Sequence, residues 1–377
     1  MSKNNNWELT INSPGRINII GEHTDYNNGF VMPTAIDKKI RFKFRKNNSQ
    51  TTCNVRSSNF NSGFTFKLDM VQKSKNQWEN YILGVIHEIQ QLSDKLQGFD
   101  CTFESNIPVG SGVSSSAALE CGVAYGLNEL FQLGLSKQTI VELSQRAEHN
   151  YIGTKCGIMD QFASVMSKKG HVILLDCQSL DYEYVPLKIE PYKILLLNTN
   201  VSHNLASGEY NIRRNQCEKG VSIIKQKYPE VNSLRDVSMD MLNEFKTKIP
   251  EVVYRRCVYV IEEKNRVLSS VEVLKANDLN LLGKNMYQTH KGLSEMYEVS
   301  CPELDFLVNF SKNYDTVIGA RMMGGGFGGC TINIIHKDAI DNFIAEAKSA
   351  YFEAFNIKLT AFEANPSEGT SIVEEQM

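Results

Sequence analysis

Hydrophobic positions in the first half of the chain recur at two periods, which separate predicted strands from predicted helices. A period of two residues indicates a strand with one buried face, and a period of about 3.6 residues indicates an amphipathic helix. Both periods occur in this half, so it is predicted to be mixed α/β. The predicted elements are a strand at residues 39–46, a helix at 77–96, a strand at 99–105, helices at 115–133 and 136–151, and strands at 171–176 and 192–198.

The second half is predicted to form a separate domain. Its pattern is largely helical from residue 209 to about residue 293. A chain of 377 residues is also longer than one ordinary hydrophobic core supports. We therefore predict an α+β protein of two domains, residues 1–190 and 191–377, with a cleft between them. The predicted elements after residue 293 are strands at 316–322 and 330–336, a helix at 338–355 and a strand at 357–362.

The charge balance narrows the class of ligand. Forty Lys plus Arg against 43 Asp plus Glu give a net charge of −3, so no basic excess exists to bind a nucleic acid or an anionic membrane. The one basic run, at residues 41–46, alternates charged with aromatic residues. A strand with one solvated basic face explains this run better than an RNA-binding platform does.

The cysteines and the first residues indicate in which cellular compartment the protein is located. Nine cysteines, an odd number, occur without a Cys-x-x-Cys pair and without a histidine cluster at zinc spacing. The first residues are polar and lack the apolar stretch of a signal peptide, and no apolar run approaches the ~20 residues of a membrane span. We expect a cytoplasmic protein with reduced thiols.

A glycine- and serine-rich segment, residues 107–120 (IPVGSGVSSSAALE), joins a predicted strand to a predicted helix. Gly110 and Gly112 let the backbone turn closely around a ligand, and the serines that follow place hydroxyl and amide groups at the positive end of the helix. A triphosphate fits this arrangement, although the segment has neither the Walker lysine nor the third glycine of the dinucleotide fingerprint. An ordinary serine N-cap after a flexible loop is an equal alternative.

Polar side chains concentrate in residues 13–30 (SPGRINIIGEHTDYNNGF), where Arg16, Glu22, His23 and Asp25 lie between glycines and apolar residues. Carboxylates accept hydrogen bonds and an imidazole donates or accepts them, so this cluster predicts a site for the vicinal hydroxyls of a polyol. A metal site is a weaker alternative, because the spacing matches no familiar metalloenzyme motif. A third interpretation is a solvated turn at residues 27–29 (NNG), but such a turn does not explain the polar cluster that precedes it.

A third segment, residues 319–330 (GARMMGGGFGGC), has five glycines within six residues ahead of an apolar strand. Such a density predicts that the backbone approaches something closely. Contact with a ligand is one explanation, and a glycine-rich connector or β-bulge is nearly as good.

Together these three segments resemble the signatures of the GHMP small-molecule kinases. Residues 15–27 (GRINIIGEHTDYN) are similar, almost residue for residue, to the signature of the galactokinase family among them. Ser13 stands where alanine is usual, which is a small-for-small change. The similarity covers most of the chain and extends to residues 77–81 (QWENY), 156–162 (CGIMDQF), 207–214 (SGEYNIRR) and 297–304 (YEVSCPEL).

This resemblance implies a GHMP kinase fold, with an N-terminal α/β domain of the ribosomal-protein type and a ferredoxin-like C-terminal domain. It also implies transfer of the γ-phosphoryl group of ATP to the anomeric C1 hydroxyl of galactose, with Mg²⁺. Asp160 would then be the catalytic base, and Arg16 would keep that carboxylate ionised and offset phosphoryl charge. Without the resemblance, a capping or surface carboxylate would be the better interpretation of Asp160.

The same resemblance implies the other site residues. Ser116 and Glu148 offer oxygen ligands for Mg²⁺, although Glu148 taken alone is typical of a solvated helix residue. Trp78 is the candidate for adenine contact, with simple helix packing as the alternative. The expected sugar-binding residues are Glu22, His23, Asp25, Gly157 and Tyr210. The expected ATP-binding residues are Trp78, Gly110, Ser111, Gly112, Val113, Ser114, Ser115 and Ser116.

Two other functions stay open at this point. A sensor that binds galactose and ATP to regulate transcription would resemble the kinase but lack a Ser-Ala pair after the phosphate loop, whereas residues 114–118 (SSSAA) are intact here. A kinase for N-acetylgalactosamine or another monosaccharide would differ in pocket shape. We predict a catalyst that acts as a monomer on galactose and ATP, without nucleic acid or membrane partners.

Overall fold

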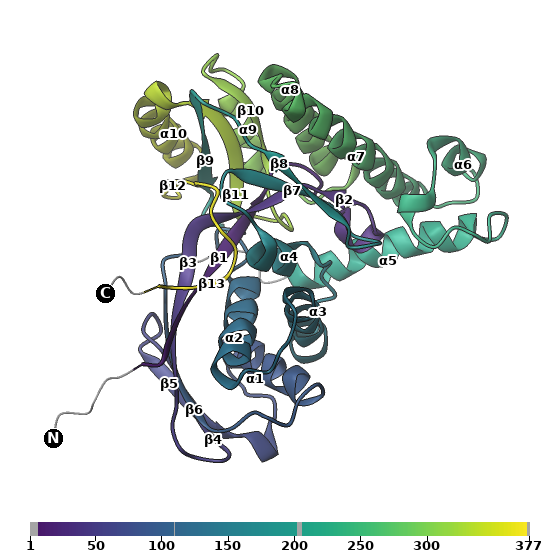
Figure 1. Ribbon diagram of the computed structural model, residues 1–377. Coiled ribbons are helices and arrows are strands. Elements are labelled where there is room, and N and C mark those ends of the chain that lie inside the picture. The colour runs from purple at the N-terminus through teal and green to yellow at the C-terminus, as the bar shows by residue number, and fades with distance from the viewer. Residues whose placement is uncertain (1–6, 109, 202–205, 375–377) are drawn as a thin grey trace.

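The first domain is built on a six-stranded sheet in the order β13-β1-β3-β6-β4-β5. The computed structural model describes residues 7–108, 110–201 and 206–374 and shows this sheet curving along the lower left of the molecule (Figure 1). The described strands pair antiparallel, except that β4 and β6 run parallel. The strands are β1 (Leu9–Asn18), β3 (Pro33–Lys46), β4 (Thr52–Ser57), β5 (Ser62–Lys67), β6 (Phe99–Ser105) and β13 (Ser371–Ile372).

Helices cover one face of this sheet. Helix α2 packs against β1 and β3, and it can lie close because its glycines face phenylalanine rings. A Cβ atom on Gly122 or Gly126 would lie 2.2 Å from the ring of Phe42 or Phe44, respectively. This close packing holds α2 against the sheet, and the predicted phosphate loop leads into that helix. The helices of this domain are α1 (Gln77–Gln90), α2 (Ser115–Phe131), α3 (Lys137–Ala147) and α4 (Met159–Met166).

Two smaller sheets complete the strands. One contains β2 (Phe30–Val31), β7 (His171–Asp176) and β8 (Tyr182–Pro186). The other has the order β10-β11-β9-β12 and pairs antiparallel throughout. Numbered along the chain this is the order 2-3-1-4 of a βαββαβ unit, so the implied ferredoxin-like domain is confirmed. Its strands are β9 (Tyr192–Asn198), β10 (Val317–Met322), β11 (Cys330–His336) and β12 (Thr360–Glu363).

The helices of the second domain fall into two groups. Helices α5, α6 and the first part of α7 form the arm at the right of Figure 1, which has a hydrophobic core of its own, whereas α8, α9 and α10 pack against the four-stranded sheet. These helices are α5 (Ala206–Ile224), α6 (Met239–Glu244), α7 (Glu251–Lys275), α8 (Leu279–Lys291), α9 (Pro302–Ser311) and α10 (Ile340–Phe355). Six single turns are η1 (Asp25–Asn27), η2 (Leu68–Met70), η3 (Glu148–Ile152), η4 (Leu234–Asp236), η5 (Gly292–Met296) and η6 (Lys337–Ala339).

Four predicted strands begin and end where the structure has them, namely 99–105, 171–176, 192–198 and 330–336. The other predicted boundaries are wrong at one end or both, and β3 begins at Pro33 instead of residue 39. Helix α1 ends at Gln90, because the polar residues that follow and the exposed Leu92 give a further turn nothing to pack against. Helix α3 gives way at Glu148 to the wider π-helical turn η3. Strand β12 starts only at Thr360, after the left-handed cap of α10.

The division at residues 190 and 191 stays a prediction. It falls between β8 and β9, where the chain passes from one sheet to another. The last strand, however, returns to the first sheet, where Ile372 of β13 pairs with Ile11 of β1. The C-terminal end of the chain therefore contributes to the N-terminal sheet.

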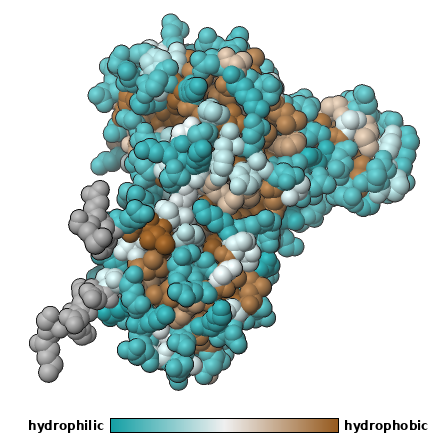
Figure 2. All heavy atoms as spheres, in the orientation of Figure 1, coloured by the Kyte–Doolittle hydropathy of each residue, from teal (hydrophilic) through white to brown (hydrophobic). Residues whose placement is uncertain are grey.

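The basic run in β3 has the form that its sequence pattern predicts. In β3, Phe42 and Phe44 are buried while Arg41 and Lys43 are exposed, so the basic run is a strand with one solvated face. Hydrophilic side chains cover most of the outer edges in Figure 2.

All nine cysteines are free. Among residues 7–108, 110–201 and 206–374, no helix is long and apolar enough to cross a membrane.

Candidate active site

A polar cavity of about 130 Å³ lies where the sugar-signature loop, η3, α4, α5 and the glycine-rich turn meet. Its lining residues come from positions as far apart in sequence as 16 and 325. Every residue predicted to be catalytic or sugar-binding lines it, together with one of the two predicted metal ligands. These lining residues are Arg16, Glu22, His23, Asp25, Glu148, Gly157, Asp160 and Tyr210.

Arg16 and Asp160 form a two-pronged ion pair in this cavity. Arg16 on β1 donates from Nε to Asp160 Oδ1 at 2.7 Å and from Nη2 to Oδ2 at 2.8 Å. Burial lowers the pKa of Arg16, but the charge and hydrogen bonds of Asp160 together with the charges of Glu22 and Asp25 outweigh burial, so the pKa is raised above its ordinary value. The guanidinium therefore stays charged and fixes both carboxylate oxygens of Asp160.

Asp25 is a buried carboxyl group on the 3₁₀ turn η1. Burial and then the charge of Asp160 raise its pKa to about 7. Its Oδ2 would lie only 2.0 Å from a Cβ atom on Gly157. Gly157 thus belongs to the site because any side chain there would displace Asp25.

His23 is held by two ring contacts in a left-handed backbone conformation, with φ of 62°. Its Nε2 lies 3.2 Å from the carbonyl oxygen of Gly325, which only accepts, so Nε2 carries the proton. Nδ1 then accepts from the hydroxyl of Tyr26 at 2.8 Å. Burial lowers the pKa of His23 to about 3, so the ring is neutral. Tyr210 of α5 lies beside it, with ring centroids 5.4 Å apart.

The phosphate loop contacts the same ion pair. Gly110, Gly112 and Ser114 all have positive φ, at 70°, 71° and 57°, and Arg16 Nη1 donates to the carbonyl of Gly112 at 2.6 Å. The Ser114 hydroxyl makes no cap bond to α2 and instead donates to Asp160. The alternative of an ordinary serine N-cap is therefore wrong for Ser114.

Two predicted ATP-binding side chains of this loop face inward. Ser111 is buried and its hydroxyl donates to the carbonyl of Pro108 at 2.7 Å, and Val113 is buried in the core. These two residues can meet a phosphate only through their backbone. Val109, within the same segment, lies outside the described residues.

An apolar groove of about 740 Å³ adjoins the start of α2. Trp78, Ser115 and Ser116 line it, and Trp78 stacks on Phe60 with ring centroids 5.7 Å apart. Trp78 also meets other aromatic rings edge-on. It both packs within the domain and forms a wall of the groove.

The glycine-rich turn between β10 and β11 approaches other backbone very closely. A Cβ atom on Gly326 would lie 2.1 Å from the carbonyl oxygen of Val299, and one on Gly324 would lie 3.2 Å from that of Gly112. Gly324 and Gly325 also line the polar cavity. The glycines therefore let this turn fit between the second domain and the phosphate loop.

Comparison with known proteins gives the family. Three family models match: GHMP kinases N terminal domain over residues 80–168, galactokinase galactose-binding signature over residues 3–46, and GHMP kinases C terminal over residues 270–354. Galactokinase of Thermosipho africanus is 42% identical over 366 residues, which cover 97% of this chain and 100% of that protein. Galactokinase of Thermotoga maritima is 40% identical over 361 residues, which cover 96% and 99%.

The chain belongs to the galactokinase family of the GHMP kinases. The solved structure of Lactococcus lactis galactokinase complexed with galactose has a TM-score of 0.92 and 33% sequence identity, covering 96% of this chain and 94% of that chain. Mevalonate kinase of Methanococcus jannaschii, with a TM-score of 0.65 and 17% identity, shares the fold. As a member of the galactokinase family, the chain is an ATP-dependent sugar kinase.

Galactokinases are expected to use Mg²⁺ with ATP, and Glu148 and Ser116 fit that use. Among the described residues, no group of three His, Cys, Asp or Glu side chains could hold a metal ion. Mg²⁺, however, is usually held by one or two carboxylates together with substrate phosphates and water. Burial and then the charge of Asp160 raise the pKa of Glu148 to about 7, so a cation beside it would relieve an unfavourable charge. Ser116 lines the neighbouring groove.

The sequence prediction missed two buried residues behind Glu148. Gln161 donates from Nε2 to Glu148 Oε2 at 2.9 Å and to Glu120 Oε2 at 3.3 Å. Burial, and then the charge of Glu148, raises the pKa of Glu120 well above its ordinary value. The available signal was a single acidic residue within the small and apolar start of α2.

Proposed function

We propose that Asp160 and Arg16 carry the phosphoryl transfer in this member of the galactokinase family. Asp160 accepts the proton of the anomeric hydroxyl of galactose as that oxygen attacks the γ-phosphorus of ATP, and ADP leaves. The observation that supports this best is the position of the ion pair, which lies in the polar cavity and bonds to the phosphate loop at Gly112 and Ser114. Sugar and triphosphate would thus meet at one carboxylate.

Arg16 has two roles in this proposal. Its two hydrogen bonds hold the Asp160 carboxylate in one orientation, which positions the base before substrate arrives. Its charge also offsets the negative charge that develops on the transferred group.

Sugar recognition is proposed to depend on Glu22, His23, Asp25 and Tyr210. Galactose differs from glucose in its axial 4-hydroxyl, and a buried carboxylate placed to accept from that hydroxyl would be left unpaired by glucose. A site built on hydrogen bonds rejects a mismatched ligand by ~10⁴-fold or more. Glucose is therefore expected to be a very poor substrate.

The product decides this proposal. Phosphorus NMR of a reaction with galactose and ATP should show phosphate on the anomeric carbon, and specificity constants should favour galactose over both glucose and N-acetylgalactosamine. Phosphate on the primary hydroxyl would refute the assigned orientation. A preference for N-acetylgalactosamine would favour the alternative kinase.

For the metal, we propose Glu148 and Ser116 as the residues that hold the Mg²⁺ of Mg²⁺-ATP, which would neutralise phosphate charge. Titration of activity against Mg²⁺ should shift to higher concentration for both Glu148→Gln and Ser116→Ala. Calorimetry of ADP binding with and without Mg²⁺ should lose its metal dependence in the same variants. Unchanged titrations with normal turnover would remove both residues from the site.

We further propose that the protein is a cytoplasmic monomer. The nine free thiols support a reducing compartment. Light scattering of the purified protein at several concentrations tests the monomer, and a mass of twice 42.6 kDa would contradict it.

A further inference from the structure

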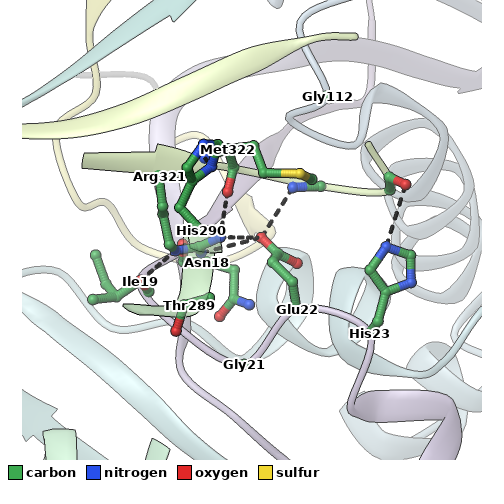
Figure 3. A network of polar contacts seen from close by, with 12 residues as sticks. Asn18, Ile19, Gly21, Glu22, His23, Gly112, Thr289, His290, Arg321 and Met322 are labelled. Carbon is green, nitrogen blue, oxygen red and sulfur yellow. Dashed lines mark hydrogen bonds and ion pairs between the residues drawn. The ribbon is translucent and has the colours of Figure 1, made fainter. Parts of the chain in front are cut away.

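Arg321, near the end of β10, is a fully buried arginine that crosses from the second domain to the sugar-signature segment. Its side chain has no exposed surface. It donates from Nε to the carbonyl of Ile19 at 2.9 Å, from Nη1 to that of Met322 at 2.6 Å and from Nη2 to that of Asn18. Figure 3 shows the guanidinium inserted between these carbonyl groups. The backbone on both sides therefore fixes the orientation of the guanidinium.

The remaining contacts of Arg321 converge on one oxygen of Glu22. Nη1 and Nη2 each lie 3.1 Å from Glu22 Oε1, and the backbone N–H of Gly324 donates to the same oxygen at 2.9 Å. Every described hydrogen bond to this carboxylate ends on Oε1. Glu22 also lines the polar cavity, so Oε2 is the oxygen left to meet a ligand.

This one-sided arrangement differs from the pairing of two other arginines with aspartates. Arg16 with Asp160, and Arg235 with Asp176, each bond to both carboxylate oxygens. Two-oxygen pairing satisfies the carboxylate and is sufficient when the pair only joins two elements. Three donors on a single oxygen instead fix the direction of the carboxylate while leaving its other oxygen available.

The turn that follows Arg321 also forms a hydrogen bond with His23, which is next to Glu22 in the sequence. Gly324 bonds to Glu22, and the carbonyl of Gly325 accepts from His23. Residues 321–325 thus orient two consecutive side chains of the predicted sugar site, although they lie about 300 residues away in sequence.

We propose that Arg321 is a positioning residue for sugar recognition. It holds Oε1 of Glu22 so that Oε2 faces the cavity and accepts a hydrogen bond from a single sugar hydroxyl. This inference rests on the proposed role of Glu22 in binding galactose.

The first test compares Arg321→Lys with Arg256→Lys. Arg256 is a matched control, because it is 2% exposed and bonds to Glu298 and the carbonyl of Met296, away from the cavity. For Arg321→Lys we expect galactose affinity, measured by calorimetry without nucleotide, to fall about 10- to 100-fold. KM for ATP should stay within about threefold, and Arg256→Lys should leave both unchanged once folded.

A panel of 2-, 3-, 4- and 6-deoxygalactose separates positioning from general damage. One deoxy sugar should bind wild type poorly, because it lacks the hydroxyl that Glu22 Oε2 accepts, and Arg321→Lys should weaken that sugar no further. The other deoxy sugars should lose affinity by the same factor as galactose. An equal loss for every sugar, or no loss for galactose, would overturn the proposal.

Glu22→Gln keeps the test decisive if Arg321→Lys does not fold. Arg321 and Gly324 would hold the amide oxygen, so the amide nitrogen would face the sugar, and the penalty should again involve one hydroxyl. Dependence on two or more hydroxyls would show that both oxygens of Glu22 face the ligand, which contradicts the proposed role of Arg321. Failure of wild type to bind galactose at all would instead refute the proposed function.

Discussion

The polar cavity, which we propose to bind the sugar, and the apolar groove, which we propose to bind the nucleotide, are lined by different chemistry. In the cavity, buried charged groups are fixed by pairing, as Arg16 fixes Asp160 and Arg321 fixes Glu22. In the groove, aromatic and aliphatic side chains such as Trp78, Tyr81 and Leu119 offer apolar area. Removing one member of a buried polar pair leaves its partner unsatisfied, whereas trimming an apolar wall removes only some contact area.

This difference predicts steep effects on the sugar side and gradual effects on the nucleotide side. A small cavity of about 130 Å³ lined by charges tolerates little change in ligand or residue. The groove of about 740 Å³ has room for adjustment. Mutations in the two regions should therefore differ in size and in which substrate they affect.

The largest effect is expected for Asp160→Asn. Loss of the base should lower kcat about 10²- to 10⁴-fold, because an amide cannot accept the hydroxyl proton. Steady-state assays of ADP release measure it. Asp176→Asn is the control, since Asp176 forms a similar two-pronged pair with Arg235 at 2.8 and 2.6 Å outside the cavity. A normal kcat for Asp160→Asn would exclude Asp160 as the base.

Gly157→Ala should have the next largest effect. The added methyl would lie 2.0 Å from Asp25 Oδ2, so the carboxylate must move. We expect KM for galactose to rise about 10- to 100-fold, with KM for ATP nearly unchanged. Gly208→Ala, where a Cβ atom meets nothing within 4 Å, is the matched control. Equal kinetics for both variants would remove Asp25 from sugar binding.

The sequence predicts strands with a regular hydrophobic alternation and misses a strand whose alternation is interrupted. Strand β6 was predicted to the residue because Phe99, Cys101 and Phe103 alternate with polar positions and are buried. Strand β1 was missed, because Arg16 and the glycine before it interrupt the alternation. In the structure Arg16 points into the cavity and pairs with Asp160, 144 residues away. A residue that serves the site therefore breaks the hydrophobic pattern by which β1 could have been predicted.

The motifs indicate which residues to consider for the site, but not how those residues are paired. Motifs indicated the polar residues of the sugar loop, and the structure brings them into one cavity. The pairing of Glu22 with Arg321 joins residues 299 apart, which no local pattern encodes. The inward-facing Ser111 and Val113 show the same limit, because a motif names residues without saying which side chains face the ligand.

A pH effect of intermediate size should distinguish the cavity from the groove. The pKa of Asp25 is raised to about 7, so its carboxylate becomes protonated below pH 7 and loses an acceptor. KM for galactose should rise up to about tenfold per pH unit below 7, while KM for ATP changes less. Asp25→Asn should flatten the galactose profile. A profile that persists in Asp25→Asn would assign the titration to another group.

The carboxyl group of Asp25 should stabilise the folded protein at low pH, whereas it should favour galactose binding at high pH. Its folded pKa of about 7 exceeds the ordinary value of 3.8, so the folded state binds the proton more tightly than the unfolded state. Its contribution to the free energy of unfolding is therefore fully present below about pH 4 and is lost as pH rises through 7. Thermal unfolding of the ligand-free protein at pH 8 should show Asp25→Asn to be more stable than wild type. A less stable variant would contradict the shift.

The smallest effect is expected in the groove, for Trp78→Phe. The substitution keeps an aromatic wall and the packing against Phe60, so KM for ATP should rise only about three- to tenfold, and KM for galactose should not change. The sequence has one other tryptophan, Trp7, which lies outside this groove. In Trp7→Phe the fluorescence then reports Trp78 alone, and ATP should alter it while galactose alone should not. If ATP leaves that fluorescence unchanged and Trp78→Phe has a normal KM for ATP, Trp78 serves packing only. Other residues of the groove would then have to bind the adenine. The proposed difference between a charged sugar site and an aromatic nucleotide site would be wrong as far as it depends on Trp78.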